Sequence, residues 1–394
     1  MTIGLTGSEL IWPLALSLAW AGGEFGARWL GLPRISSYGI VGFLLARPQL
    51  GVLPDPSGGP VALLADYAFA LILFELGYRI NLRWLRHNPW LGVTSIIESV
   101  ASFLAVSTVV WRFGMALEPS LLLAALAMAT SPAAIVRVAN DLNSAGQVTE
   151  RSLHLSALNC LLSVFTFKVI AGYWVFSSAG SLFQAIWASL VVMAVSVGLG
   201  VLFGVLFAGL LRQTANPAQS ATIVFALAVL LLTALTTALK FSPLLAAITF
   251  GIMARHRRVV LSPAQRNFGV LGEVLTVLLF VFVAATLDWQ RMKEGIDLAL
   301  LVLVVRLASK TAVTTGFARL SGITWRKGLL TGLALTPQSV FVILLLEQSR
   351  HLGIGWINDM AGLATLVLLL EIGAPLVTRW ALLRAGEAHP ARRG

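Results

Sequence analysis

Long apolar stretches, each long enough to cross a lipid bilayer, alternate with short polar joints along almost the whole chain. A transmembrane helix needs about 20 mostly apolar residues, or about 17 to 25 when it is tilted. Prolines with polar neighbours, such as Asn88-Pro89 and Ser262-Pro263, mark the joints. The pattern predicts an all-α polytopic membrane protein with about thirteen transmembrane helices, at about residues 9–28, 35–51, 61–80, 90–111, 119–139, 150–176, 181–211, 218–239, 242–256, 267–287, 296–319, 327–349 and 357–382.

The basic residues are divided unevenly between the two sides of this predicted membrane. Of the 28 Lys and Arg residues, 19 fall on one side, six on the other and three within helices. Cytoplasmic loops of membrane proteins carry the excess of Lys and Arg. We therefore expect the N-terminus outside and the C-terminus in the cytoplasm, as in a multi-pass protein of a bacterial cytoplasmic (inner) membrane.

The overall composition excludes several classes of function. Hydrophobic residues make up 58% of the chain and charged residues only 11%, whereas soluble domains carry about 25% charged residues. The net charge of +11 comes from residues between apolar stretches, so the expected partner is the lipid bilayer and not nucleic acid. The sequence has no Walker-type loop, and its five histidines lack metal-ligand spacing. We expect no enzymatic activity, no cofactor and no bound metal.

Thirteen helices divide into two sets of six around one linker helix. The odd linker turns the second set upside down, which produces the inverted repeat of many secondary transporters. The sequence therefore predicts a first repeat at 1–176, a linker helix at 177–214, a second repeat at 215–384 and a short cytoplasmic tail at 385–394.

The fifth helix of each predicted half contains a proline break. Thr130-Ser131-Pro132 interrupts the first half, and Thr336-Pro337 interrupts the second. A proline inside a helix removes a backbone donor and frees a carbonyl, which a membrane tolerates only where the freed groups face protein or a wet cavity. Each break alone is consistent with a packing kink. Because the breaks occupy matching places, we expect two crossed discontinuous helices with a transport site between them.

Four stretches carry a resemblance to a known family. They begin at Gly31 (GLPRISSYGIVGFLLA), Leu71 (LILFELGYRINL), Ala127 (AMATSPAAIVRV) and Lys310 (KTAVTTGFARLSG). Their order and spacing resemble the cation/proton antiporter superfamily, the sodium/proton exchanger-like membrane domain of the monovalent cation:proton antiporter-2 type. The resemblance implies a core domain that moves against a dimerisation domain, hence a homodimer, and the exchange of a monovalent cation (Na⁺ or K⁺) for protons.

The sixth helix departs from this family at the ion site. Members carry Asp-Asp or Asn-Asp there, and the second aspartate binds the cation and takes up the proton, whereas this chain has Asn159-Cys160. A thiol in apolar surroundings stays neutral and is a poor substitute for a carboxylate. Gln338-Ser339 replaces the Gly-Glu pair of some members, and Lys310 matches the family's basic position, with Arg306 on the same helical face. The expected ion-binding pocket contains Thr130, Ser131, Asn159, Cys160, Arg306, Lys310, Thr336 and Gln338, beside the helix breaks at Pro132 and Pro337.

Acidic residues within other helices are candidates for the missing proton carrier. A charged residue at the centre of a transmembrane helix costs about 2.5–3.5 kcal/mol, so its presence indicates function by default. Glu98 lies deepest in its helix and is the first candidate; the alternative is a structural ion pair with Arg306 or Lys310. Glu75 is the second candidate, and its alternative is a pair with Arg79, four residues further on.

The sequence leaves three functions open. The first is antiport of a monovalent cation against protons at a non-standard ion site. The second is transport of an anion or organic acid on the same scaffold, because half-helix N-termini and the Arg306/Lys310 pair favour negative charge. The third is a membrane sensor or assembly partner that keeps the fold and does not transport.

Overall fold

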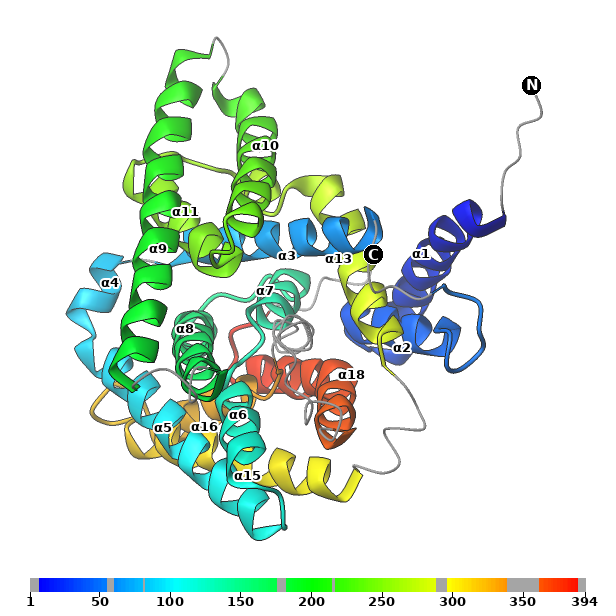
Figure 1. Ribbon diagram of the computed structural model, residues 1–394. Helices are drawn as coiled ribbons and strands as arrows, with labels where there is room; N and C mark the ends of the chain where they lie inside the picture. Colours follow the sequence, from blue (N-terminus) through cyan, green and yellow to red (C-terminus); the bar gives the residue numbers. More distant parts are fainter. Residues whose placement is uncertain are drawn as a thin grey trace.

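The structure is a computed structural model that describes residues 7–54, 60–80, 82–175, 182–214, 217–287, 296–338 and 361–388. Within these ranges the chain forms helices and connecting loops, without a strand (Figure 1). Six helices of the described residues are long and apolar enough to cross a membrane, and two further apolar helices are shorter. The protein is therefore an all-helical, multi-pass membrane protein, and the predicted fold class is confirmed.

The order of helices follows the predicted spans closely. The first half contains α1 (Gly7–Phe25), the π-helix η1 (Gly26–Leu30), α2 (Arg34–Leu45), α3 (Pro60–Arg79), α4 (Leu82–His87), α5 (Pro89–Arg112), α6 (Leu117–Met128), α7 (Pro132–Asp141) and α8 (Gln147–Val175). After α9 (Leu182–Gln213) come α10 (Pro217–Ala238), α11 (Pro243–His256), α12 (Pro263–Arg266), α13 (Gly269–Ala285), α15 (Ile296–Gly316), α16 (Trp325–Ala334) and α18 (Ala361–Arg384). The part of the predicted twelfth helix beyond residue 338 lies outside the described residues.

Prolines begin six of these helices, namely α3, α5, α7, α10, α11 and α12. A proline at the first helical position lacks only an N–H group that would have no partner within the helix, and its fixed φ angle suits the helix. The prolines that mark joints in the sequence therefore also determine where the following helices start.

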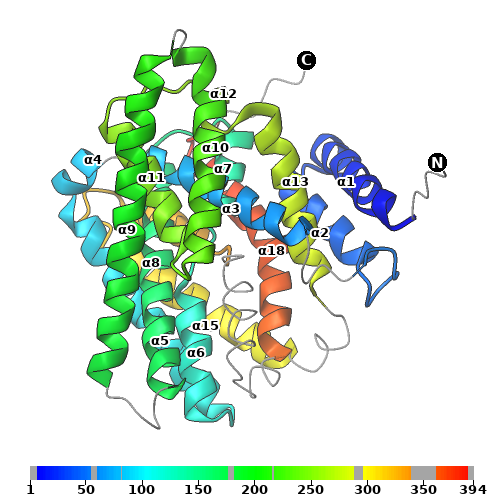
Figure 2. The ribbon, with the colours of Figure 1, turned by 45° about the horizontal axis from the view of Figure 1, so that its top comes forward.

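The helices pack into two bundles (Figures 1 and 2). The first, here called the scaffold bundle, contains α1, α2, α3, α10, α11 and α13, with α3 packed against α11, α13 and α10. The second, the core bundle, contains α5, α6, α7, α8, α15, α16 and α18, with α5 packed against α6, α8 and α15. Helix α9 packs against α10 and α11 on one side and α8 on the other, so it connects the two bundles.

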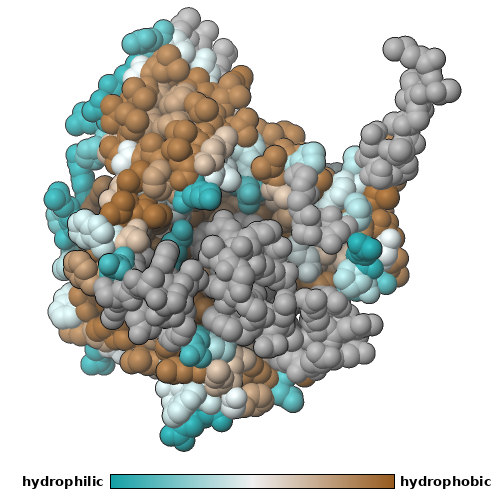
Figure 3. All heavy atoms as spheres, in the orientation of Figure 1, coloured by the Kyte–Doolittle hydropathy of each residue, from teal (hydrophilic) through white to brown (hydrophobic). Residues whose placement is uncertain are grey.

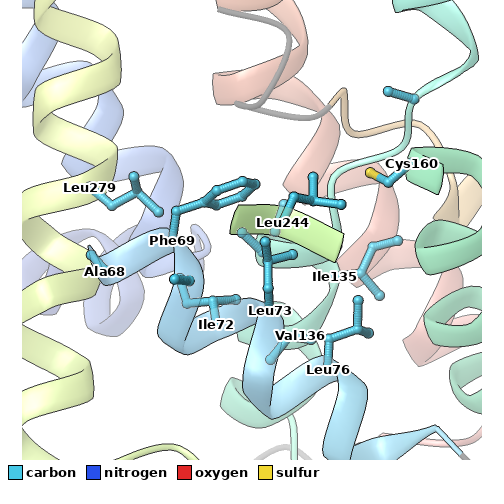
Figure 4. Close-up of a cluster of buried hydrophobic side chains, with 14 of the residues drawn as sticks. Ala68, Phe69, Ile72, Leu73, Leu76, Ile135, Val136, Cys160, Leu244 and Leu279 are labelled. Atoms are coloured by element: carbon cyan, nitrogen blue, oxygen red, sulfur yellow. The ribbon is translucent and has the colours of Figure 1, made fainter. Parts of the chain in front are cut away.

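The two bundles meet mainly where α7 and α18 contact α3 and α2. Much of this contact is apolar: Leu73 and Leu76 of α3 are buried beside Ile135 and Val136 of α7 (Figure 4). Apolar contacts lack directional partners, so such an interface permits sliding at a lower cost than one built from buried hydrogen bonds.

The outer surface of the molecule is apolar where it would face lipid. Large aliphatic side chains along α9 and α10 are exposed, and they cover much of the face that these helices form (Figure 3). Leu206 of α9 is 54% exposed and Leu227 of α10 is 60% exposed. Soluble monomers rarely expose so large an apolar patch, and the bilayer is the solvent that accommodates it.

The described C-terminal residues return to the start of α8. The carboxylate of Glu387 accepts hydrogen bonds from the backbone N–H of Val148 (2.9 Å) and Thr149 (2.8 Å). The first N–H groups of a helix have no partner within the helix, and negative charge is favourable near them. A residue beyond α18 thus caps the helix that carries Asn159 and Cys160.

Glycines allow the backbones of α3 and α11 to touch. A Cβ atom at Gly251 of α11 would overlap the carbonyl oxygen of Phe74, and one at Gly77 of α3 would overlap that of Ile248. Small residues at such crossings let membrane helices approach closely.

We expect Gly251→Val to destabilise the protein by about 1–3 kcal/mol, because the added side chain forces backbone against backbone. Thermal unfolding of the purified protein in detergent measures the effect. Gly198→Val on α9 is the matched control, since a Cβ there would meet no atom within 4 Å. Equal melting temperatures for the two variants would contradict the close approach of α3 and α11.

Candidate functional site

The two proline breaks meet inside the core bundle. The first lies between the end of α6 at Met128 and the start of α7 at Pro132, and the second follows the end of α16 at Ala334. The backbone N–H of Ser131 donates to the carbonyl of Pro337 over 2.8 Å, which joins the breaks directly. The structure therefore brings together the two segments that the sequence predicts to cross.

Local chemistry explains the shape of the first break. Ser131 is the N-cap of α7, and its hydroxyl accepts a hydrogen bond from the N–H of Ala134 over 3.2 Å. Pro132 follows at the first helical position, where it needs no donor. In the segment that follows α16, the side-chain amide of Gln338 donates to the Leu126 carbonyl of α6 over 3.2 Å.

Arg306 of α15 lies between the C-terminal ends of the two half-helices α6 and α16, and its side chain is fully buried. It donates to the carbonyls of Ala127 and Ala129 at the end of α6, both over 2.8 Å. It also donates to the carbonyl of Thr336 over 2.6 Å, and at 3.4 Å to those of the residues on either side. The guanidinium thus satisfies carbonyls freed by both breaks and balances the negative ends of two helix dipoles.

Glu98 of α5 and Lys310 of α15 form a fully buried ion pair. The Lys310 ammonium also donates to the carbonyl of Met128 over 3.1 Å. The other oxygen of the Glu98 carboxylate accepts a hydrogen bond from the Asn159 amide over 2.6 Å, and Ser102 donates to the first oxygen over 3.2 Å. The Glu98 carboxylate therefore has a charged partner and two neutral donors.

Asn159 and Cys160 of α8 belong to the same buried network. The amide nitrogen of Asn159 lies 3.4 Å from the Thr130 hydroxyl, and the Cys160 thiol donates to the Thr130 carbonyl over 3.0 Å. The amide oxygen of Asn159 accepts from the hydroxyls of Ser95 (2.9 Å) and Ser99 (3.2 Å). Every one of these side chains is buried.

The structure gathers almost all the residues predicted for the pocket into one network. The crossing contains the side chains of Thr130, Asn159, Cys160, Arg306, Lys310 and Gln338, the backbone N–H of Ser131 and the backbone carbonyls of Thr336 and Pro337, with Glu98 beside them. Pro132 begins α7 at this break, and the Thr336 hydroxyl donates to the Leu333 carbonyl instead. Sequence reasoning missed Ser95, Ser99 and Ser102. Their positions relative to Glu98, three residues before, one after and four after, place all four on one face of α5, and this helical spacing was the available signal.

Glu75 lies in a different cluster, at the junction of the two bundles. Its carboxylate is 3.0 Å from Arg79 of the same helix, 3.8 Å from Arg137 of α7 and 4.0 Å from Arg266 of α12. It also accepts a hydrogen bond from Asn140 of α7 over 2.9 Å. Glu75 thus forms the predicted pair with Arg79, and its described partners belong to this junction and not to the pocket.

Positive charge is in excess at this junction. Burial lowers the pKa of Arg266, which lies outside the membrane-spanning helices, and the neighbouring Arg79 guanidinium lowers it further. A second cross-bundle ion pair joins Arg34 of α2 to Asp141 of α7 over 3.2 Å. Charged contacts between bundles therefore concentrate at the C-terminal end of α7.

Metal binding has no evident site in the described part of the chain. No group of three His, Cys, Asp or Glu side chains there is arranged to hold a metal ion. The chemistry that the pocket offers is binding by oxygen atoms and by paired charges.

These features define a class of protein: a multi-pass membrane protein in which the break between α6 and α7 meets the segment that follows α16, next to buried, paired charges. Residues 14–384 match the family model of the sodium/hydrogen exchanger transmembrane domain. The chain belongs to this family of membrane cation/proton antiporters and is a transporter, not an enzyme.

Solved structures agree with this assignment of fold. The chain is similar to the sodium proton antiporter MjNhaP1 of Methanocaldococcus jannaschii at pH 8, with 16% identity, a TM-score of 0.65 and 96% of each chain covered. A structure of the same antiporter from electron microscopy matches with 18% identity and a TM-score of 0.74, covering 98% of this chain and 100% of that one. At such identities the likeness describes the fold alone.

Proposed function

We propose that this chain exchanges a monovalent cation, Na⁺ or K⁺, for protons, and that Glu98 binds the two ions in turn. The observation that carries the proposal is the 2.6 Å hydrogen bond from the Asn159 amide to the Glu98 carboxylate. The antiporter resemblance implies an aspartate where this chain has Cys160, directly after Asn159. Glu98 supplies a carboxylate beside the same asparagine from the neighbouring helix α5, so the non-standard site still contains the anionic ligand that antiport requires.

The partners of Lys310 support a cation as the substrate. Its ammonium contacts a carboxylate oxygen of Glu98 and the carbonyl oxygen of Met128. Oxygen atoms of these two kinds are the ligands that a dehydrated hard cation takes. In the proposed cycle a cation displaces the ammonium from Glu98, and a proton later displaces the cation, so that one carboxylate serves both ions.

Movement of the core bundle against the scaffold bundle would expose Glu98 to one side of the membrane and then the other. The apolar contact between α3 and α7 supports such sliding, while the cluster at the end of α7 must open for it. In this proposal residues 1–176 and 215–384 are inverted repeats, and 177–214, which includes α9, is the linker. We also propose a homodimer, which the family resemblance implies. We place it in a bacterial inner membrane with the N-terminus outside, which the distribution of basic residues supports.

An anion or organic acid is the second candidate substrate, because the described residues at the crossing include two buried basic side chains, Arg306 and Lys310, and one buried acidic side chain, Glu98. The hydrogen bonds weigh against it. Arg306 donates to backbone carbonyls of both half-helices, and Lys310 is paired with Glu98. An anion would have to displace the partners that already satisfy the Arg306 and Lys310 side chains.

Proteoliposomes that contain the purified chain test these alternatives. With an imposed pH gradient reported by an internal dye, we expect addition of Na⁺ or K⁺, but not of choline, to dissipate the gradient. Empty liposomes are the control. Uptake of labelled chloride or a small carboxylate without any cation-dependent proton flux would support the anion transporter. No flux of either kind under any gradient would support a sensor or assembly protein.

A further inference from the structure

Helix α5 carries a buried polar stripe around Glu98. Ser95, Glu98, Ser99 and Ser102 are at most 1% exposed. The opposite face is apolar and open, with Ile96 54% exposed. Buried hydroxyls must find hydrogen-bond partners in a membrane protein, because lipid offers none. We therefore expect the three serines on this face to have hydrogen-bond partners near the carboxylate.

The carboxylate of Glu98 determines how the Asn159 side chain is oriented. The amide nitrogen lies 2.6 Å from a carboxylate oxygen. The reversed amide would bring its own oxygen to that distance from the carboxylate, and two acceptors repel each other there. With the nitrogen towards Glu98, the amide oxygen points away from the carboxylate, and Ser95 and Ser99 both donate to it.

These contacts form one chain of donors: two serine hydroxyls to the amide oxygen, and the amide nitrogen to the carboxylate. Hydrogen bonds in series polarise one another, so donors at the oxygen strengthen the donation from the nitrogen. We infer that Ser95 and Ser99 are positioning residues for the exchange reaction: by holding the Asn159 amide, they set the pH at which Glu98 trades its proton for a cation. The inference rests on the proposed function of Glu98 and adds its regulation by uncharged groups.

The charged and titratable groups around Glu98 are separate from the two serines. Among the described residues, Lys310 of α15 pairs with Glu98, Arg306 of the same helix interacts electrostatically with both of them, and Cys160 of α8 interacts with the two basic side chains. None of these is altered by changing Ser95 or Ser99, so the two hydroxyls can be removed while the charges stay in place.

The test compares the pH dependence of cation-driven proton flux in the wild-type protein and in S95A/S99A. Without the two donors the amide oxygen has no described partner, so the amide nitrogen donates more weakly to Glu98 and the negative charge of the carboxylate is less favoured. We expect the pH of half-maximal flux to rise by about one unit, equivalent to a tenfold change in proton affinity. Each single variant should give a smaller shift, and S95T/S99T, which keeps both hydroxyls, should restore the wild-type midpoint.

S107A is the matched control on the same helix. Ser107 donates to the carbonyl of Leu104 in its own helix (3.1 Å), so its removal should leave the midpoint unchanged. Identical midpoints for wild type and a folded S95A/S99A, with the thermal stability of S107A as reference, would overturn the inference. If the double variant does not fold, the two single variants decide the question.

A second measurement separates this inference from the proposed function. The infrared band of a protonated carboxylic acid that disappears in Glu98→Gln reports Glu98 directly, whether or not flux is detected. If this band titrates at a higher pH in S95A/S99A, the positioning role stands even if the wild-type protein shows no antiport. If flux depends on Glu98 and neither the band nor the flux profile moves, the proposed function stands and the positioning role fails.

Discussion

Glu98→Gln should abolish cation-driven proton flux. The glutamine cannot carry a proton between the two sides, and it leaves the Lys310 ammonium buried without its counter-charge. Breaking a buried ion pair by removing one partner costs about 3–5 kcal/mol. This cost lowers the stability of the protein, whereas flux should fall to the level of empty liposomes because no proton carrier remains at this position. Dye-reported flux in proteoliposomes, with protein incorporation checked for each preparation, measures the effect.

Two further variants distinguish loss of chemistry from loss of structure. E98Q/K310M replaces the whole pair with uncharged groups, which often recovers stability. We expect its melting temperature to exceed that of Glu98→Gln while its flux stays absent. Glu24→Gln is the control acid, because Glu24 pairs with Arg34 at 2.7 Å near the surface, where one ion pair contributes little. Flux in Glu98→Gln at the level of Glu24→Gln would remove Glu98 from the mechanism.

Arg306→Met should cause the largest loss of stability among single substitutions in the core bundle. The methionine fills part of the volume but leaves the carbonyls of Ala127, Ala129 and Thr336 without their donor. Each buried polar group left unsatisfied costs about 1–3 kcal/mol, so the three together exceed the effect of an ordinary core substitution. Thermal unfolding in detergent and the yield of monodisperse protein measure the outcome.

Arg306→Lys offers an intermediate case. A lysine ammonium is a point charge and cannot bridge both half-helix ends as a planar guanidinium does. We expect it to melt between the wild type and Arg306→Met. Arg212→Met on α9 is the control, since Arg212 is an exposed arginine that donates to a single described carbonyl, that of Arg257. If Arg306→Met melts together with Arg212→Met, the guanidinium does not hold the crossing.

Several parts of this architecture follow from the sequence because they depend on local properties. Apolar length predicts membrane helices, and a proline predicts a helix start or a break wherever it stands. Pro132 and Pro337 therefore revealed the breaks before any contact was known. The spacing of four residues likewise predicted that Glu75 and Arg79 would pair and that Arg306 and Lys310 would share a helical face.

The partners of Glu98 could not be predicted from the sequence, because they depend on which faces of distant helices meet. Glu98 and Asn159 are 61 residues apart, and only the packing of α5 against α8 brings them together. The sequence allowed two roles for Glu98, a proton carrier or the partner of Arg306 or Lys310 in an ion pair. The tertiary structure pairs it with Lys310, because Arg306 already donates to the carbonyls of the crossing.

The serines of α5 illustrate the same limit. In the sequence Ser95 and Ser99 are unremarkable residues of an apolar helix, and only their spacing around Glu98 indicates a shared face. They contact the side-chain oxygen of Asn159, which lies on α8, a helix that begins 35 residues after α5 ends. Hydropathy and proline positions thus determined the membrane fold and its two breaks, whereas the arrangement of donors around the buried carboxylate was decided by packing between helices, since a hydrogen bond requires an approach that no local pattern specifies.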